Sequence, residues 1–177
     1  MSHLDHKALA PTSVSCSVLT VSDSRTPNTD ASGRAIRQLL ENAGHVIIGH
    51  TIVKDEPEQV TSYVREQLAD ASIQIIITTG GTGITSRDGT FEAIDSMLEK
   101  RLDGFGELFR MLSFQEIDAA AMLSRATAGI ASAGKESASK AARTAIFVLP
   151  GSEHAVRLAM TRLILPELGH LAQQLQR

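Results

Sequence analysis

The sequence predicts an α/β protein, a three-layer α/β/α sandwich with a largely parallel central sheet. Short apolar runs rich in β-branched residues alternate along the chain with segments in which apolar residues recur every three or four positions. The first pattern is typical of buried strands, and the second of helices that pack on a core. Strands that alternate with helices are joined by right-handed crossovers, which make a sheet parallel and cover both of its faces.

The first half of the chain predicts three strands and two helices. The strands are the apolar runs 14–21, 46–53 and 73–77. A helix over 32–43 has its apolar residues on one face, and Gly44 follows its end, where a left-handed residue commonly stops a helix. Asp55 can act as the N-cap of the next helix, with Pro57 in the first turn and Glu58 as a capping-box partner.

The second half predicts shorter helices and two more strands. Thr90 can cap a helix that runs to about Lys100, and a Gly104-Phe105-Gly106 hinge separates it from a helix over 107–114. More helix is expected at 119–125. The remaining elements are strands over 126–131 and 144–149 and a closing helix from Glu153. Between the two strands, 133–142 reads as a mobile surface loop.

Length and composition predict one domain with small-molecule partners. We expect a mobile tail over 1–13 and a single domain over 14–177, large enough to bury roughly 70% of its unfolded surface. A net charge of −3 with interspersed signs argues against nucleic-acid binding, and no apolar run is long enough for a membrane helix. Cys16 lies in an apolar run and predicts a buried thiol, and the histidines lack zinc-site spacing. We therefore expect a cytoplasmic protein.

The stretch 73–90 carries the strongest functional signal. A buried strand runs directly into a glycine-rich loop, Gly80-Gly81-Thr82-Gly83, which is followed by Arg87-Asp88. Such a loop lets backbone N–H groups approach a ligand, and the hydroxyls of Thr79 and Thr82 can donate to phosphate oxygens. Asp88 could hold a divalent cation against those phosphates. An ordinary strand-end turn is the alternative, because glycine-rich turns after strands are common.

Three other loops strengthen the interpretation of a phosphate site. They follow the other strands and consist of Ser22-Asp23-Ser24, Lys54-Asp55-Glu56 and Pro150-Gly151-Ser152. In parallel sheets, ligands bind beyond the carboxyl ends of the strands. If the strands are parallel, all four loops meet at one edge of the sheet, which predicts a site for a phosphorylated ligand.

Several short motifs occur in one order along the chain. They are Thr20-Val21-Ser22-Asp23, Asp30-Ala31-Ser32-Gly33, Val53-Lys54-Asp55-Glu56, Thr79-Gly80-Gly81-Thr82-Gly83 with Arg87-Asp88, Gly104-Phe105-Gly106-Glu107, Met122-Leu123-Ser124-Arg125 with Ala128-Gly129, and Leu149-Pro150-Gly151-Ser152. Together they resemble the molybdopterin adenylyltransferase family of molybdenum cofactor biosynthesis, the MoaB/MogA type, which also forms the G domain of gephyrin-like proteins. The resemblance covers roughly 14–168, and the stretch GFGELFRMLSF looks more like the MoaB branch.

The resemblance implies adenylyl transfer from Mg-ATP to the terminal phosphate of molybdopterin, with release of pyrophosphate. Mg²⁺ is then the cofactor, and ATP and molybdopterin are the substrates. The carboxylates that matter in the family fall on Asp55 and Asp88, which the resemblance makes catalytic and metal-binding. The implied binding residues are Ser22, Asp23, Thr79, Gly80, Gly81, Thr82, Gly83, Arg87, Ser124, Arg125, Pro150, Gly151 and Ser152.

Each assignment has a structural alternative. Asp55 could only cap a helix, Asp88 could only form a turn with Gly89, and Arg125 could only close a helix against its dipole. The family commonly has Val and Pro within the stretch 88–91, and some relatives have a lysine near His154. A pterin-binding or assembly protein without adenylyl transfer is the alternative function. A nucleotide-binding protein unrelated to molybdopterin is a third.

The resemblance also implies self-association, as a homotrimer or as a homohexamer built from two trimers. Six large apolar residues fall within 105–114: Phe105, Leu108, Phe109, Met111, Leu112 and Phe114. So many apolar side chains on one short helix cannot all face one core. Part of this surface is therefore expected to pack on a second copy of the chain.

Overall fold

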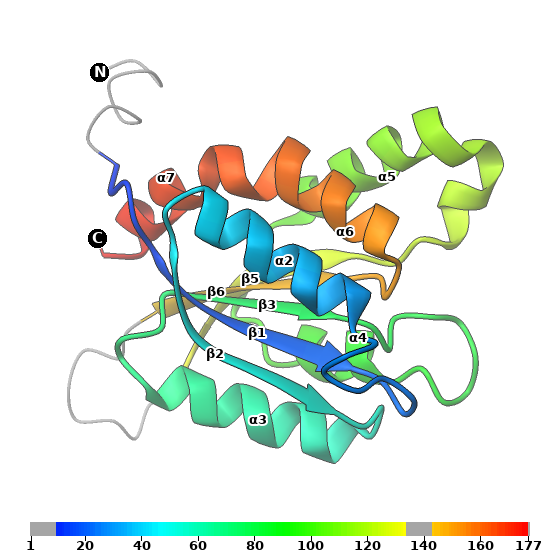
Figure 1. Ribbon diagram of the computed structural model, residues 1–177, viewed down its shortest axis with the longest axis horizontal. Helices are drawn as coiled ribbons and strands as arrows, with labels where there is room; N and C mark the ends of the chain where they lie inside the picture. The colour runs from blue at the N-terminus through cyan, green and yellow to red at the C-terminus, as the bar shows by residue number, and fades with distance from the viewer. Residues whose placement is uncertain (1–9, 134–142, 177) are drawn as a thin grey trace.

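The computed structural model describes residues 10–133 and 143–176 and contains one six-stranded sheet in the order β2-β1-β3-β6-β5-β4 (Figure 1). The strands are β1 (Ser15–Val21), β2 (Val46–Val53), β3 (Ile75–Thr79), β4 (Lys100–Arg101), β5 (Thr127–Ser132) and β6 (Arg143–Leu149). Neighbours among β2, β1, β3 and β6 are parallel, whereas β5 runs antiparallel to β6 and β4 antiparallel to β5. The sheet is therefore largely parallel.

Helices cover both faces of the sheet (Figure 1). One face carries α2 (Ala31–Asn42), α5 (Asp103–Ile117), α6 (Glu153–Ala159) and α7 (Leu165–Leu175). The other carries α3 (Pro57–Ala69) and α4 (Thr90–Asp95). The predicted three-layer fold is confirmed.

Alternation along the central strands gives each face its own core. On β3, Ile75 and Ile77 pack under α2 and α5 with Ile36 and Phe109, while Ile76 packs with α3 on the opposite face. All of these side chains are fully buried. Burial of each one stabilises the fold by roughly 1.5–3 kcal/mol relative to leaving it in water.

The starts of α2 and α3 differ in how they are capped. The Oδ1 of Asp30 accepts a hydrogen bond of 2.9 Å from the Gly33 N–H, and Gly44 follows the helix with φ of 83°. The predicted helix and its terminal glycine are thus confirmed to within one residue. Helix α3 begins at Pro57 without a side-chain cap, so the capping role considered for Asp55 is wrong. That carboxylate points instead toward the residues described below.

The region after the glycine loop differs most from expectation. Helix α4 ends at Asp95 rather than near Lys100, because the chain turns there to pair with β5. The backbone N–H groups of Glu99 and Leu102 each donate to a β5 carbonyl over 2.8 Å.

The predicted glycine hinge is also wrong, since α5 runs through it without a break. A Cβ at Gly106 would lie 2.8 Å from the carbonyl oxygen of Ala126, so the glycine allows the helix to approach β5 closely. The helix expected at 119–125 is a short 3-10 helix, η1 (Asp118–Leu123).

The closing helix is interrupted by a π-helical segment, η2 (Met160–Ile164), just before Pro166. A proline has no N–H to donate to the carbonyl of the preceding turn, and a wider turn accommodates that loss. None of the helices described is long and apolar enough to cross a membrane. The tail at 1–9 and nearly all of the expected surface loop, 134–142, lie outside the described residues.

Candidate functional site

A cavity of about 480 Å³ lies beyond the carboxyl ends of the parallel strands. The loops that follow β1, β2, β3 and β6 all contribute to it, together with the segment after η1. Its lining residues are Val21, Ser22, Asp23, Asp55, Gly80, Gly81, Thr82, Gly83, Asp88, Leu123, Ser124, Arg125, Pro150 and Gly151. Twelve of these fourteen residues are among the fifteen that the sequence singled out.

The glycine loop is folded tightly around two left-handed residues. Gly80 has φ of 99° and Gly81 has φ of 64°, conformations that L-residues rarely adopt. A Cβ at Gly80 would lie 2.1 Å from the carbonyl oxygen of Val21, and one at Gly81 would lie 2.2 Å from the hydroxyl of Thr90. Glycine at both positions lets the loop pass between β1 and the start of α4.

The loops after β3 and β6 are fastened to each other. The Thr79 hydroxyl donates to the carbonyl of Pro150 over 2.8 Å, and the Gly80 N–H donates to the carbonyl of Leu149 over 3.1 Å. Thr79 is fully buried and does not line the cavity. Its hydroxyl therefore holds the two loops together, in place of the phosphate contact expected for it.

Asp55 reaches the cavity from the loop after β2. Its Oδ1 accepts a hydrogen bond from the Thr90 hydroxyl over 3.1 Å, and it lies next to Gly81, where a Cβ would come within 2.7 Å. Burial raises the pKa of the Asp55 carboxyl, the Thr90 hydrogen bond opposes that shift, and the charges of Asp88 and Asp23 add to it. Negative charge is thus concentrated at this edge of the sheet.

Asp88 is held in place by its own loop. Its Oδ2 accepts hydrogen bonds from the N–H and the hydroxyl of Thr85, and these contacts are the main reason why its pKa is lowered. The carboxylate packs against Gly83, where a Cβ would lie 2.6 Å from Oδ2. Asp88 therefore does take part in a turn, with Thr85 and not with Gly89, and the same side chain also lines the cavity.

Asp23 links the other loops around the cavity. Its Oδ1 accepts a hydrogen bond of 3.2 Å from the Asp55 N–H, and its Oδ2 accepts one of 3.0 Å from the Arg87 guanidinium. The guanidinium side chain of Arg87 is 72% exposed, and Arg87 is not part of the lining. Ion pairs this exposed contribute at most about 1 kcal/mol, so the link orients the loops more than it stabilises the fold.

Arg125 enters the cavity from the segment between η1 and β5. One of its nitrogens donates to the carbonyl of Gly83 over 2.9 Å, and the other pairs with Glu92. Its guanidinium carbon lies 4.3 Å from the centre of the Phe91 ring. These partners belong to the glycine loop and α4, so the alternative in which Arg125 only closes a helix is wrong. Ser124 lines the cavity beside it.

Besides Thr79 and Arg87, three residues that were predicted or considered lie outside the lining. The Ser152 hydroxyl accepts from the Ala155 N–H over 3.4 Å and caps α6. Lys54 lines a separate polar hollow with residues at the start of α3. On the surface, Nε2 of His154 lies 3.3 Å from Oε2 of Glu116.

Sequence reasoning missed the two threonines that position the carboxylates. Thr85 lies three residues before Asp88, a spacing typical of hydrogen-bonded turns, so a local signal was present. The contact between Thr90 and Asp55 joins residues 35 apart in the sequence and has no local signal. The lining residues Val21 and Leu123 were also missed, because an apolar residue at a strand or helix end carries no chemical signature.

The donor set fits a magnesium ion bound together with a phosphorylated substrate. Within 10–133 and 143–176, no three His, Cys, Asp or Glu side chains gather closely enough to hold a metal ion by themselves. Mg²⁺ is usually bound by one or two carboxylates, with waters and substrate phosphates completing its coordination. Asp55 and Asp88 supply two carboxylates on the wall of one cavity.

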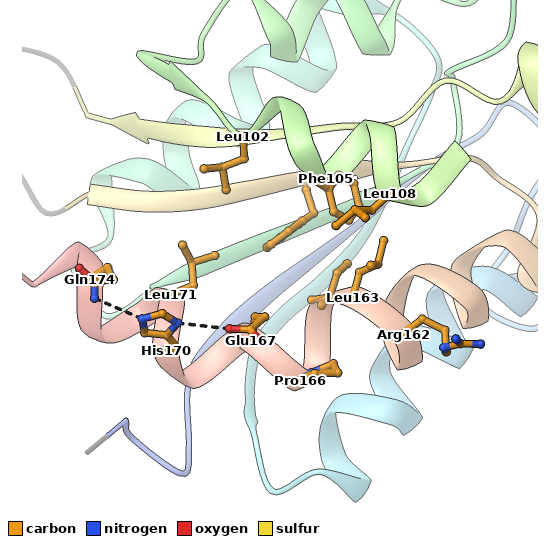
Figure 2. Close-up of a pocket in the computed structure, with 12 residues that line it drawn as sticks. Leu102, Phe105, Leu108, Arg162, Leu163, Pro166, Glu167, His170, Leu171 and Gln174 are labelled. Carbon is orange, nitrogen blue, oxygen red and sulfur yellow. Dashed lines mark hydrogen bonds and ion pairs between the residues drawn. The ribbon is translucent and has the colours of Figure 1, made fainter. Parts of the chain in front are cut away.

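A second cavity of about 460 Å³ lies between α5 and the C-terminal helical segment (Figure 2). Apolar side chains form most of its wall. Its polar members are Arg162, Glu167, His170 and Gln174, and Nδ1 of His170 lies 3.2 Å from Oε2 of Glu167. It contains none of the residues predicted for the site. Arg162 is its one guanidinium, and its lining includes no glycine loop and only one carboxylate, so the polar cavity is the better candidate.

Known proteins resemble this chain over nearly its whole length. Residues 17–170 match the family described as "Probable molybdopterin binding domain". Molybdenum cofactor biosynthesis protein B of Halalkalibacterium halodurans is 49% identical over 176 residues, which cover 99% of this chain and 98% of that protein. The protein of the same name from Bacillus subtilis is 46% identical over 178 residues, or 100% and 99% of the two chains.

Solved structures show the same relationship. A crystal structure of a molybdenum cofactor biosynthesis protein B matches with a TM-score of 0.85 and 46% identity, covering 95% of this chain and 99% of that one. The tungsten cofactor synthesizing protein MoaB from Pyrococcus furiosus matches with a TM-score of 0.81 and 34% identity, covering 95% and 100%. This chain therefore belongs to the molybdopterin-binding domain family, among the molybdenum cofactor biosynthesis proteins of the MoaB type.

Proposed function

We propose that this protein transfers the adenylyl group of Mg-ATP to the terminal phosphate of molybdopterin. A phosphate oxygen of molybdopterin forms a bond to the α-phosphorus of ATP, the bond from that phosphorus to the β-bridging oxygen breaks, and pyrophosphate leaves. The attacking oxygen is already anionic, so the reaction needs no base. It needs two phosphate groups brought together and their charge neutralised.

One observation supports the proposal above the others. Two carboxylates from different loops, Asp55 and Asp88, face the same cavity as a glycine-rich loop. The loop can supply donors to phosphate oxygens, and the carboxylates can hold Mg²⁺, which supplies charge neutralisation when it is bound. A reaction between two anions needs both their phosphates bound and their charge neutralised. The glycine loop suits the first task and the carboxylates with Mg²⁺ suit the second.

The polar groups of the lining divide the work in this proposal. The backbone N–H of Gly81 and the hydroxyl of Thr82 bind phosphate oxygens. The N–H of Gly80 already donates to Leu149, and that of Gly83 acts on the Asp88 carboxylate. Ser124 and Arg125 face the same cavity, and Arg125 adds positive charge beside it. A covalent enzyme intermediate is not part of the mechanism. Cys16, the only cysteine, is buried away from the site, and burial raises the pKa of its thiol to about 12.

Pyrophosphate release tests the proposal. Purified protein is incubated with molybdopterin, ATP and Mg²⁺, and pyrophosphate is measured with each component omitted in turn. We expect release only from the complete mixture. Binding of molybdopterin without pyrophosphate release would favour the pterin-binding or assembly protein, and binding of ATP without affinity for molybdopterin would favour an unrelated nucleotide-binding protein.

A further inference from the structure

We propose that Phe91 is a positioning residue for this site, because its ring holds the Arg125 guanidinium while Arg125 fixes the Gly83 peptide beside Asp88. The inference rests on the proposed function for its effect on the reaction, although its structural part stands without it. Phe91 is half-buried in the first turn of α4 and is not among the lining residues of the cavity.

Arg125 joins three segments that are distant in the sequence. It donates to the Gly83 carbonyl over 2.9 Å, pairs with Glu92, and lies over the Phe91 ring at 4.3 Å. Its own side chain is 25% exposed, whereas that of Glu92 is 63% exposed. An ion pair with so exposed a carboxylate holds a flexible side chain only weakly. The face of the ring therefore provides the firmer support for the guanidinium.

Gly83 is held from both sides. Its carbonyl accepts from Arg125, while its N–H contributes to the lowered pKa of the Asp88 carboxyl. These two groups belong to the two planar peptide units that meet at the Gly83 Cα, so Arg125 and Asp88 restrain this residue from its two sides. The Asp88 carboxylate packs so closely on Gly83 that a Cβ there would lie 2.6 Å away. A movement of Gly83 would therefore displace the Asp88 carboxylate.

Asp88, Arg125 and Phe91 differ in how directly their contacts reach the cavity. Asp88 faces the cavity, Arg125 faces both the cavity and Gly83, and Phe91 acts only through Arg125. Replacement of Phe91 should consequently change the geometry of the glycine loop without removing a group that contacts substrate. A leucine keeps apolar bulk but has no ring, and a tyrosine keeps the ring.

The first test measures the loop directly, by hydrogen–deuterium exchange of the amides in 80–88. In Phe91→Leu we expect exchange roughly fivefold faster than in the unaltered protein, the scale expected for the loss of a partly exposed cation–π contact. Phe91→Tyr should leave exchange unchanged. Arg125→Gln removes the same contact from its other side and should speed exchange in the same segment. Unchanged exchange in both Phe91→Leu and Arg125→Gln would overturn the inference.

The second test measures adenylyl transfer in a double-mutant cycle. Phe91→Leu should lower kcat by roughly fivefold with little change in KM for molybdopterin, and Phe91→Tyr should restore the rate. In the Arg125→Gln background, Phe91→Leu should have no further effect, because the contact is already lost. Equal effects of Phe91→Leu in both backgrounds would mean that Phe91 does not act through Arg125.

The two tests separate failure of this inference from failure of the proposed function. If the unaltered protein released no pyrophosphate, adenylyl transfer would be wrong, while the exchange data would still decide whether Phe91 and Arg125 hold the loop. If the protein were active but exchange were insensitive to both variants, only the role of Phe91 would fall.

Discussion

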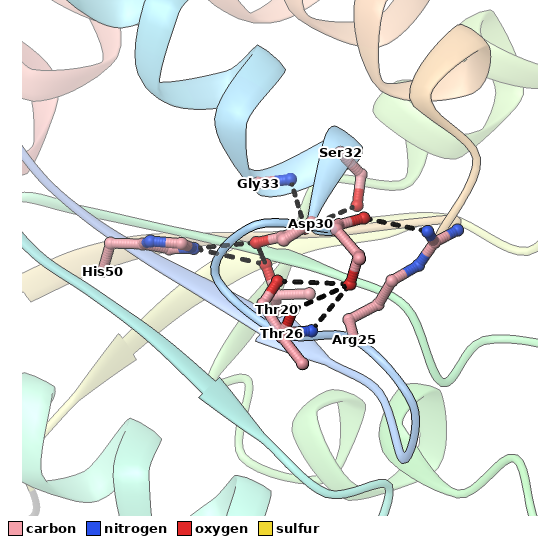
Figure 3. A network of polar contacts seen from close by, with 8 residues as sticks. Thr20, Arg25, Thr26, Asp30, Ser32, Gly33 and His50 are labelled. Atoms are coloured by element: carbon pink, nitrogen blue, oxygen red, sulfur yellow. Dashed lines mark hydrogen bonds and ion pairs between the residues drawn. The ribbon is translucent and has the colours of Figure 1, made fainter.

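The Asp30 carboxylate lies 3.0 Å from Nε2 of His50, in a polar network at the start of α2 (Figure 3). Asp30 is 1% exposed and also accepts hydrogen bonds from the Thr20 hydroxyl over 2.7 Å and the Gly33 N–H over 2.9 Å. The network connects β1, β2 and α2 just before the loop that carries Ser22 and Asp23. It therefore anchors one side of the candidate site without belonging to its lining.

Loss of this carboxylate should destabilise the fold. Asp30→Ala removes a helix cap and leaves buried hydrogen-bonding groups of Thr20 and His50 without their partner. We expect the free energy of unfolding to fall by about 2–3 kcal/mol. Denaturant unfolding measures the change. A loss below about 0.5 kcal/mol would mean that water replaces the carboxylate at little cost.

The same residue predicts a dependence of stability on pH. Burial acts to raise the pKa of Asp30, but the hydrogen bonds from Gly33 and Thr20 and the nearby His50 outweigh it, so the pKa lies below the usual 3.8. The unfolded chain then takes up a proton at a higher pH than the folded protein. The stabilisation is present above pH 3.8 and is lost as pH falls through the lowered pKa. Asp30→Asn should reduce this acid-dependent loss in unfolding experiments between neutral and low pH.

Two neighbouring threonines should respond in opposite ways to the same substitution. The Thr78 hydroxyl is buried and has no hydrogen-bond partner, whereas the Thr79 hydroxyl donates to Pro150. Thr78→Val should be neutral or stabilising by up to about 1 kcal/mol, and Thr79→Val should destabilise by about 1–3 kcal/mol. Thermal unfolding of the pair checks this prediction. Equal losses in the two variants would contradict it.

Removal of either cavity carboxylate should affect turnover more than folding. Asp88→Asn keeps the shape of the side chain but removes the charge, and we expect adenylyl transfer to slow by roughly a hundredfold or more. Asp55→Asn should behave similarly if both carboxylates hold Mg²⁺. Fold and molybdopterin affinity should remain nearly unchanged. Near-normal turnover of Asp88→Asn at saturating Mg²⁺ would assign this residue a structural role and require another metal ligand.

A single methyl group in the glycine loop should disable the site. Gly81→Ala places a Cβ 2.2 Å from the Thr90 hydroxyl and 2.7 Å from Asp55, at a residue with φ of 64°. We expect a destabilised loop and a large loss of adenylyl transfer. Gly104→Ala is the matched control, because a Cβ there meets nothing within 4 Å. It should keep full activity and gain a few tenths of a kcal/mol in stability.

We propose that the protein associates through α5 and η1, as a trimer or a hexamer. Leu108, Met111 and Phe114 are 48–58% exposed on α5, while Phe105, Phe109 and Leu112 are buried beneath them. Light scattering should give a mass three or six times 18.9 kDa. Phe114→Glu should reduce the measured mass, because it places a charge in the interface. A mass of one chain at micromolar concentration would contradict the proposal.

Local patterns in the sequence were sufficient for most of the architecture. Apolar runs identified five of the six strands in the described residues. The chemistry of the loops after them pointed to Asp55, Asp88 and the glycine loop, which line the cavity. Strand β4 was missed because two residues carry no periodicity, and its pairing depends on β5. The Gly104-Phe105-Gly106 hinge was predicted from helix propensity, but close packing of Gly106 on Ala126 favours a helix there.

The contacts that position the site are where sequence reasoning fell short. Thr79 was expected to donate to phosphate, and only the spatial proximity of Pro150 reveals its actual acceptor. Arg125 and Glu92 are 33 residues apart, and no local rule pairs them. Residue type indicates what a side chain can do, whereas the folded chain determines which partner it meets.

The position of β6 has a consequence for biosynthesis. It is the last strand of the sheet along the chain, yet it lies between β3 and β5 in space. During translation, β1, β2 and β3 can pair as soon as they leave the ribosome, but β5 has no neighbour to join them until β6 emerges. The carbonyls of Leu149 and Pro150 that hold Gly80 and Thr79 arrive with it. A nascent chain that stops short of residue 150 therefore lacks the contacts that fasten the glycine loop, so ligand binding would report that synthesis has passed this residue.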